Sequence, residues 1–230
     1  MWQEVRNELH PKGVEVVTVA LDTGGVDAAA PFIDAAKAEH PSLIDEAHRL
    51  DELLGIVNVP SGVWIDEQGM IVRPPEPAFP GRVGIDYEKL ELPEGTPQRL
   101  VEMLEETRKI RIDPEGYLAA LRDWATNGAR SGFALSPDEV IERSAPRPPE
   151  VSEAAASFEL GQHLHRTGHA EDAVRWFRRA HRLQPDNWTY KRQAWSFLDP
   201  FQGPSKEYEG DWLSDVREIG AENYYPPVEL

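Results

Sequence analysis

The sequence predicts an α/β domain followed by an all-helical region. Helix and strand patterns alternate over residues 1–73, which is typical of an α/β domain. Six prolines then fall within residues 74–97, so neither a helix nor a central strand can run through that segment. From Thr96 onward, apolar residues recur at helical spacing. A chain of 230 residues with 40% hydrophobic content has room for two such regions.

The first two elements follow from the positions of the apolar residues. Trp2, Val5 and Leu9 lie on one face of a short amphipathic helix, which Pro11 helps to end. Residues 14–21 are then almost all apolar or β-branched. That composition predicts a strand that is buried on both faces of a sheet.

The remaining elements of the α/β region are shorter. We expect a helix over residues 26–40, an extended stretch at 42–45 and a helix over 47–54. Residues 62–66 and 70–72 are short, mostly apolar runs on either side of a tight turn at residues 66–69, so they predict a β-hairpin.

Helical patterns and proline-rich boundaries divide the rest of the chain. Helices are expected within residues 97–143 and at 153–167, 170–183 and 188–198, and the end of the chain is expected to be irregular. The predicted regions are an α/β domain at 1–82, a connection with helices at 83–149, a helical repeat with a capping helix at 150–198, and an acidic aromatic tail at 199–230.

Composition excludes several classes of function. The chain has no Cys, so these residues contain no disulfide, no thiol nucleophile and no Cys-ligated metal or iron–sulfur cluster. Its net charge of -17 disfavours binding to nucleic acid or to anionic lipid. We find no apolar run of the roughly 18–20 residues that a membrane-spanning helix needs and no secretory signal, and we expect a cytoplasmic protein.

Four segments of the α/β region occur in an order that is known from other proteins. They are the stretches 13–22, 41–45, 55–60 and 65–71. Over residues 1–73 this order resembles the thioredoxin fold, in particular the branch with the cytochrome-maturation reductases and the peroxiredoxins. The resemblance implies that Pro60 follows a cis peptide bond and that a substrate backbone lies beside Val59 and Pro60. It also implies that Asp45 lies near Pro60.

The chain departs from that family at its start. In the family, a first strand and a redox motif precede the helix that begins here at Trp2, so the thioredoxin-like domain is truncated. One interpretation is a scaffold without a redox centre that is kept for binding. The other is a thiol-disulfide oxidoreductase or peroxidase whose Cys or selenocysteine motif lies upstream of Met1. An edge left without its strand also favours a homodimer.

A second resemblance covers the helical pair at 153–183. Its key positions are Leu160, Gly161, Leu164, Gly168, Ala173, Phe177, Ala180 and Pro185. These resemble a tetratricopeptide repeat, in which small residues allow two helices to approach closely and Gly permits the reversal between them. The helices in 97–143 could then stack in front of it as degenerate repeats. The resemblance implies a face that binds a protein or peptide partner, formed by Ala155, Phe158, Gln162, His165 and Arg166.

Other candidate sites have simpler interpretations. On a helix, His163 and His165 point about 200° apart, so with His169 they are expected to be solvated rather than to bind metal. The acidic pairs Asp45/Glu46 and Asp51/Glu52 are expected to be solvated faces, and Gly24-Gly25 is too short to cradle a phosphate. We therefore expect no catalytic residue, metal or cofactor.

One basic surface stays open to two interpretations. Basic residues outnumber acidic ones only between residues 153 and 198, where one helix carries Arg175, Arg178, Arg179 and Arg182. This face could bind an acidic partner or the chain's own acidic tail. The aromatic residues Tyr224 and Tyr225 could dock a partner or fold back on the chain.

Overall fold

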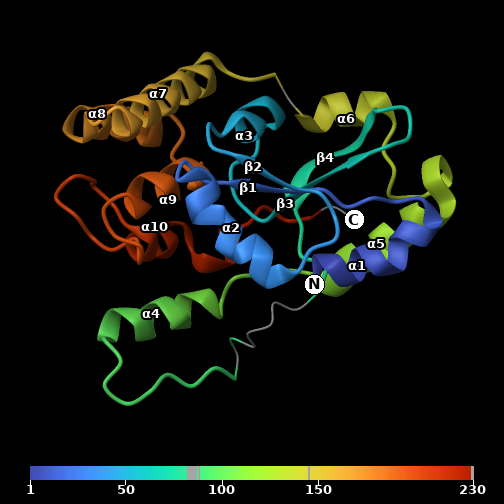
Figure 1. Ribbon diagram of the computed structural model, residues 1–230, viewed down its shortest axis with the longest axis horizontal. Coiled ribbons are helices and arrows are strands. Elements are labelled where there is room, and N and C mark those ends of the chain that lie inside the picture. Colours follow the sequence, from blue (N-terminus) through green and yellow to red (C-terminus); the bar gives the residue numbers. More distant parts are fainter. Residues whose placement is uncertain (82–86, 88, 145, 229–230) are drawn as a thin grey trace.

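The computed structural model describes residues 1–81, 87, 89–144 and 146–228 (Figure 1). It combines two small sheets with a larger number of helices. The N-terminal part is mixed α/β and the C-terminal part is helical, in the predicted order. Residue 82, at the predicted end of the first domain, lies outside the described residues.

The elements of the α/β part match the expected order. They are α1 (Trp2–Leu9), β1 (Thr18–Leu21), α2 (Gly25–Ala36), β2 (Ser42–Asp45), α3 (Arg49–Leu54), β3 (Ser61–Ile65) and β4 (Ile71–Pro77). The chain ends α1 with a 3-10 turn and a left-handed Gly13. Helix α2 is shorter than expected because Lys37 takes a left-handed conformation at its end.

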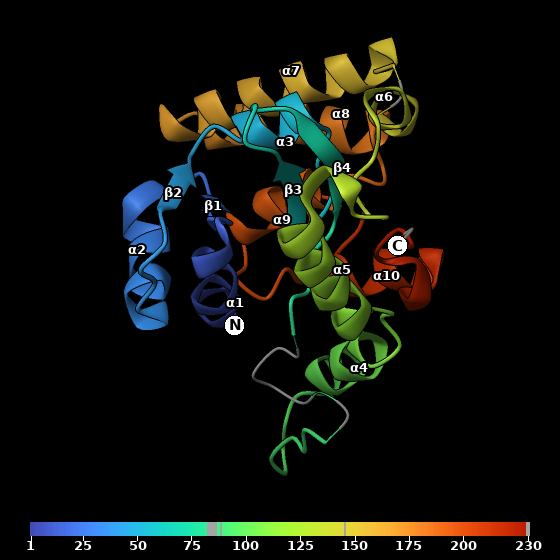
Figure 2. The same ribbon diagram turned by 90° about the vertical axis from the view of Figure 1, so that its right-hand side faces the viewer.

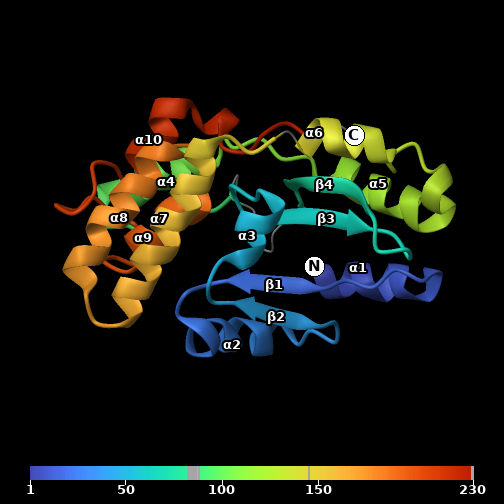
Figure 3. The same cartoon turned by 90° about the horizontal axis from the view of Figure 1, so that it is seen from above.

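Two separate two-stranded sheets take the place of one larger sheet. Strands β1 and β2 are parallel and begin with Thr18 opposite Ser42, whereas β3 and β4 are antiparallel. Figures 2 and 3 both show the strands side by side in the order β2, β1, β3, β4. Within the described residues, β1 pairs only with β2 and β3 pairs only with β4.

Two expectations for the strands are corrected. The predicted strand at 14–21 begins only at Thr18, and none of its residues is fully buried. Its apolar composition suits a central strand, but within the described residues β1 is hydrogen-bonded to a strand on one side only. Strand β4 continues past Val72 to Pro77, because prolines are tolerated in a strand at the edge of a sheet.

The first core joins β3 to α5 (Pro114–Asn127). The indole of Trp64 donates a hydrogen bond of 3.0 Å to the Tyr117 hydroxyl and stacks on Trp124. The Arg73 guanidinium, only 1% exposed, lies over the Trp64 ring and donates two hydrogen bonds to the carboxylate of Glu76. A buried cation is stable here because it is paired with a carboxylate and hydrogen-bonded to it.

The helices before residue 144 do not extend the repeat as expected. Helix α5 packs on the first core, α6 (Pro137–Ser144) packs on β4, and α4 (Gln98–Thr107) packs on α10 (Trp212–Ile219). The apolar face of α5 therefore covers the sheet, where Trp64 offers a large apolar surface. These helices belong with the α/β part and the tail instead of stacking in front of α7.

The second core contains α7 (Pro149–Arg166), α8 (Ala170–Leu183) and α9 (Trp188–Ser196). The helix-turn-helix prediction is confirmed, with Gly168 left-handed in the turn. A Cβ on Gly161 would lie 2.7 Å from Phe177 Cε1, so only glycine permits this close approach.

The tail is more ordered than expected. Its helix α10 is capped reciprocally by Asp211 and Ser214. Trp212 and Tyr224 are buried in the second core, so the tail folds back on the chain. No helix among the described residues has both the length and the apolar character that crossing a membrane requires.

The burial of His181 predicts how the stability of the fold changes in acid. Burial lowers the pKa of His181, which packs against Trp195 and Tyr208, to about 3. The folded state therefore binds this proton less readily than the unfolded state, whose pKa is near 6.5. The free energy of unfolding should fall by up to about 1.4 kcal/mol per pH unit as the pH drops from about 6.5 towards 3.

Urea unfolding of the His181→Phe variant at several pH values measures this contribution. The variant should lose part of the acid sensitivity of the parent chain, while His163→Phe, at an exposed position of α7, should keep all of it. Equal pH profiles for the parent and His181→Phe would contradict the prediction.

Candidate functional site

The strongest polar constellation lies where β1 and β2 end. Thr23 follows β1, and His48 follows β2 at the start of α3. Parallel strands end at the same edge of a sheet, where ligand sites of α/β proteins are commonly found. Figure 3 shows α7, α8 and α9 beside this end of the strands. The site is thus a junction between the α/β part and the helical part.

A hydrogen-bonded network fills this junction. We define the junction network as Thr23, His48, Asp51, Gln162, Thr189 and Gln193. His48 contacts Asp51 Oδ2 through Nδ1 at 3.0 Å and Gln193 Oε1 through Nε2 at 3.1 Å. Gln162 donates to the Thr23 hydroxyl at 2.7 Å, and the Thr189 hydroxyl donates to Asp51 at 3.0 Å.

The partners of His48 define how its ring is held. Gln193 Oε1 also accepts the backbone N–H of Thr23 at 3.1 Å, so it presents an oxygen, and not an amine, to His48 Nε2. The carboxylate of Asp51 faces Nδ1. Both ring nitrogens therefore face an oxygen atom, and the ring joins β1, α3 and α9 in one buried contact.

Asp45 holds the start of α3. One of its oxygens accepts the backbone N–H of Leu50 at 2.7 Å and the other that of Ala47 at 3.3 Å. This holds the turn in which His48 is left-handed, with φ of 53°. Asp45 is not among the residues that line the small cavity at Pro60, and its nearness to Pro60 stays a prediction.

A cavity of about 170 Å³ opens next to the junction network, between α3 and α7. We call it the junction cavity. Its aromatic wall is formed by His48, Phe158 and Tyr190, with the Phe158 and Tyr190 rings stacked 4.1 Å apart. Ala155 and Ala156 line the side that α7 contributes. Small alanine side chains leave this space open.

Charged residues of both signs surround the mouth of the cavity. Arg49 lies 3.7 Å from Glu159, and both side chains are exposed. Glu52 pairs with Arg147 at 3.0 Å. Because exposed ion pairs contribute little to stability, Arg49 and Glu159 can exchange their contact for one with a ligand at small cost.

The five residues expected to bind a partner do not form one open face. Ala155 and Phe158 line the junction cavity, but Phe158 is only 2% exposed and Gln162 is 1% exposed in the junction network. His165 stacks on Phe197, and its partial burial lowers its pKa. Arg166 is exposed. The α/β part already covers much of this face, which corrects the expectation of an open surface.

Val59 and Pro60 lie against the end of the chain. The peptide bond between them is cis, as predicted. The Tyr225 hydroxyl donates to the Val59 carbonyl at 2.8 Å, and Asn58 donates to the Tyr224 carbonyl at 2.9 Å. A small cavity of about 40 Å³ remains there. The tail therefore folds back over the position at which a substrate was expected.

The basic face of α8 is partly engaged within the chain. Arg178 donates to the backbone carbonyls of Lys206 and Glu207 in the tail, and Arg179 pairs with Glu153. These contacts favour the intramolecular interpretation for those two arginines. The described part of the chain contains no group of three His, Asp or Glu residues able to hold a metal ion.

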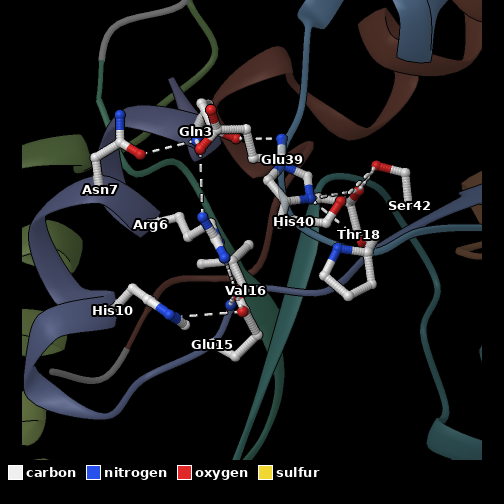
Figure 4. Close-up of polar contacts among 11 residues, drawn as sticks. Gln3, Arg6, Asn7, His10, Glu15, Val16, Thr18, Glu39, His40 and Ser42 are labelled. Atoms are coloured by element: carbon white, nitrogen blue, oxygen red, sulfur yellow. Dashed lines mark hydrogen bonds and ion pairs between the residues drawn. The ribbon is translucent and has the colours of Figure 1, made fainter.

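A second polar cluster holds α1 on the starts of β1 and β2 (Figure 4). Arg6 donates two hydrogen bonds to Glu15 and lies 3.5 Å from Glu39. The hydrogen bond from Arg6 lowers the pKa of Glu15 to about 2. Thr18 and Ser42 bond to each other beneath His40. These contacts are explained by the packing of α1 on the sheet, so the junction is the better candidate site.

Sequence reasoning gave a binding role to only one member of the junction network, Gln162, and missed the others. Asp51, expected on a solvated face, is only 2% exposed. Its position three residues after His48 was the one local signal. Thr189 and Gln193 lie about 140 residues further along the chain, where no spacing rule connects them with α3.

The comparisons with known proteins place the chain in no family. No family model matches the sequence, and no curated protein or solved structure matches it.

Removing the buried side-chain amide of Gln193 from the junction network should lower the stability of the fold strongly. Gln193→Ala leaves the Thr23 N–H and His48 Nε2 without their acceptor, so the free energy of unfolding should fall by about 1–3 kcal/mol. Gln98→Ala, which removes one exposed hydrogen bond within α4, should change it by less than about 0.5 kcal/mol. Urea denaturation compares the two, and equal effects would refute the importance of the network.

Proposed function

We propose that the chain is a protein-interaction module, made of a thioredoxin-like part and a tetratricopeptide-like part, that binds a peptide at the junction cavity. The cavity itself is the observation that carries this proposal. It lies where the two parts meet, and Ala155 and Phe158, which the repeat resemblance assigns to partner binding, line it. With no Cys in the chain, the binding needs no redox centre.

The size and lining of the cavity define the ligand. A cavity of about 150 Å³ accommodates benzene, so about 170 Å³ accommodates one phenyl ring or one leucine side chain. The stacked Phe158 and Tyr190 favour an aromatic side chain at this position. Arg49 and Glu159 at the mouth can contact the carbonyl and N–H groups of the peptide backbone. The ligand class is therefore a peptide with one aromatic anchor.

Titration with N-acetyl-phenylalanine amide, followed by NMR, tests this assignment. The probe should shift signals of His48, Phe158 and Tyr190, while N-acetyl-alanine amide should not. Ala156→Trp, which fills the cavity from α7, should weaken binding of the probe at least tenfold. Ala170→Trp, at an exposed position of α8, should leave it unchanged. Equal binding by both variants would refute the proposal.

The second candidate is a thiol-disulfide oxidoreductase or peroxidase whose reactive Cys or selenocysteine lies upstream of Met1. The order α1, β1, α2, β2, α3, β3, β4 supports it, because that is the order the thioredoxin resemblance implies. A disulfide-reduction assay with a dithiol reductant should find activity only in an upstream-extended chain. No activity in either form would leave the binding module as the better account.

A further inference from the structure

The edges of β1 and β3 that face each other present backbone N–H and carbonyl groups that pair with no strand among the described residues. In Figure 3 the two strands lie side by side and run in opposite directions. Each is paired on its outer side only, β1 with β2 and β3 with β4, among the described residues. We call the facing edges the inner edges. They are distinct from the junction cavity, which lies between α3 and α7.

The hydrogen bonds on the outer sides show which backbone groups face the inner edges. Thr18 donates its N–H to the Pro41 carbonyl on the β2 side at 3.0 Å. Because successive residues of a strand alternate in direction, the N–H groups of Val19 and Leu21 point to the inner edge.

The same argument applies to β3. The Pro60 carbonyl accepts from Ala78, and the Asp66 N–H donates to the Met70 carbonyl, both on the β4 side. The register shifts beside Val63 place their extra residues on β4, so alternation along β3 directs the N–H and carbonyl of Val63 to the inner edge. Both inner edges therefore present donors and acceptors.

The side chains of these strands indicate that something covers them. Strand β1 consists of Thr-Val-Ala-Leu and has no charged residue or proline, the features that normally protect an edge strand. Such apolar composition is typical of a strand in the middle of a sheet. All four of its residues are only partly buried, and Val17 and Ile65 are 52% and 53% exposed.

We infer that the inner edges of β1 and β3 bind an extended segment of a partner protein as an inserted strand. One segment can be parallel to one edge and antiparallel to the other, because β1 and β3 run in opposite directions. Pairing with both edges requires them to stand about 10 Å apart, which is twice the spacing between strands. Alternate apolar side chains of the segment would cover the half-exposed residues of β1.

The net charge of the chain indicates which kind of segment binds the inner edges. Each copy of the chain carries a net charge of -17, so two copies repel each other. A neutral or basic segment has no such penalty. The inserted strand is therefore assigned to a partner protein, and the homodimer expected from the sequence becomes one outcome of the test.

Amide hydrogen exchange followed by NMR tests this inference. The probe is an acetylated eight-residue peptide of alternating valine and threonine with a lysine at each end. In the chain alone, the amides of Val19, Leu21 and Val63 should exchange fast, while the amide of Ala20, which points towards β2, exchanges slowly. Saturating peptide should slow the three inner amides at least tenfold and leave Ala20 unchanged.

The same peptide N-methylated at every second residue is the matched control, because the methyl groups remove the donors of one of its edges and block close approach along it, so it cannot pair with both strands at once. It should leave the inner amides of at least one strand without protection. Protection of the inner amides before peptide is added would overturn the inference, because the edges would then already be paired. If that protection increased with protein concentration, the inner edges would be assigned to contact with a second copy of the chain. Absence of protection at saturating peptide, or equal protection by the methylated control, would also overturn it.

Discussion

The contact of His48 with Asp51 and Gln193 is the constraint on which the arrangement of the two parts depends. It connects the start of α3 to α9, 145 residues further along the chain. Thr23 and Gln162 extend the connection from the end of β1 to α7. Buried polar groups are costly unless they are paired, so the network specifies one relative placement of the two parts. Displacing either part would leave several of these groups without partners.

That placement determines what each candidate surface can do. It brings α3 against α7, which encloses the junction cavity and buries Phe158 and Gln162. It also brings the tail across Val59 and Pro60, so the tail covers a position that the thioredoxin resemblance assigned to a substrate. The inner edges of β1 and β3 lie outside these contacts. The described part of the chain therefore has a position at Pro60 that the tail covers, a small cavity at the junction, and edges of β1 and β3 that pair with no other strand.

Local rules predicted the elements well, because periodicity and turn residues act over short distances. The hairpin of β3 and β4, the reversal at Gly168 and the approach of Gly161 to Phe177 all follow from such patterns. The rest depended on contacts distant in sequence. Asp51 looked like a surface carboxylate because its partner Thr189 lies 138 residues away. Helix α10 was missed because its apolar face is short, although Asp211 and Ser214 carried a capping signal.

The central claim is that the junction network makes the two parts one cooperative unit. Differential scanning calorimetry of the chain near neutral pH tests it most directly, because independent domains unfold separately. The account predicts a single transition whose calorimetric enthalpy equals its van't Hoff enthalpy. Two resolved transitions, or a calorimetric enthalpy well above the van't Hoff value, would show that the parts unfold independently and would contradict it.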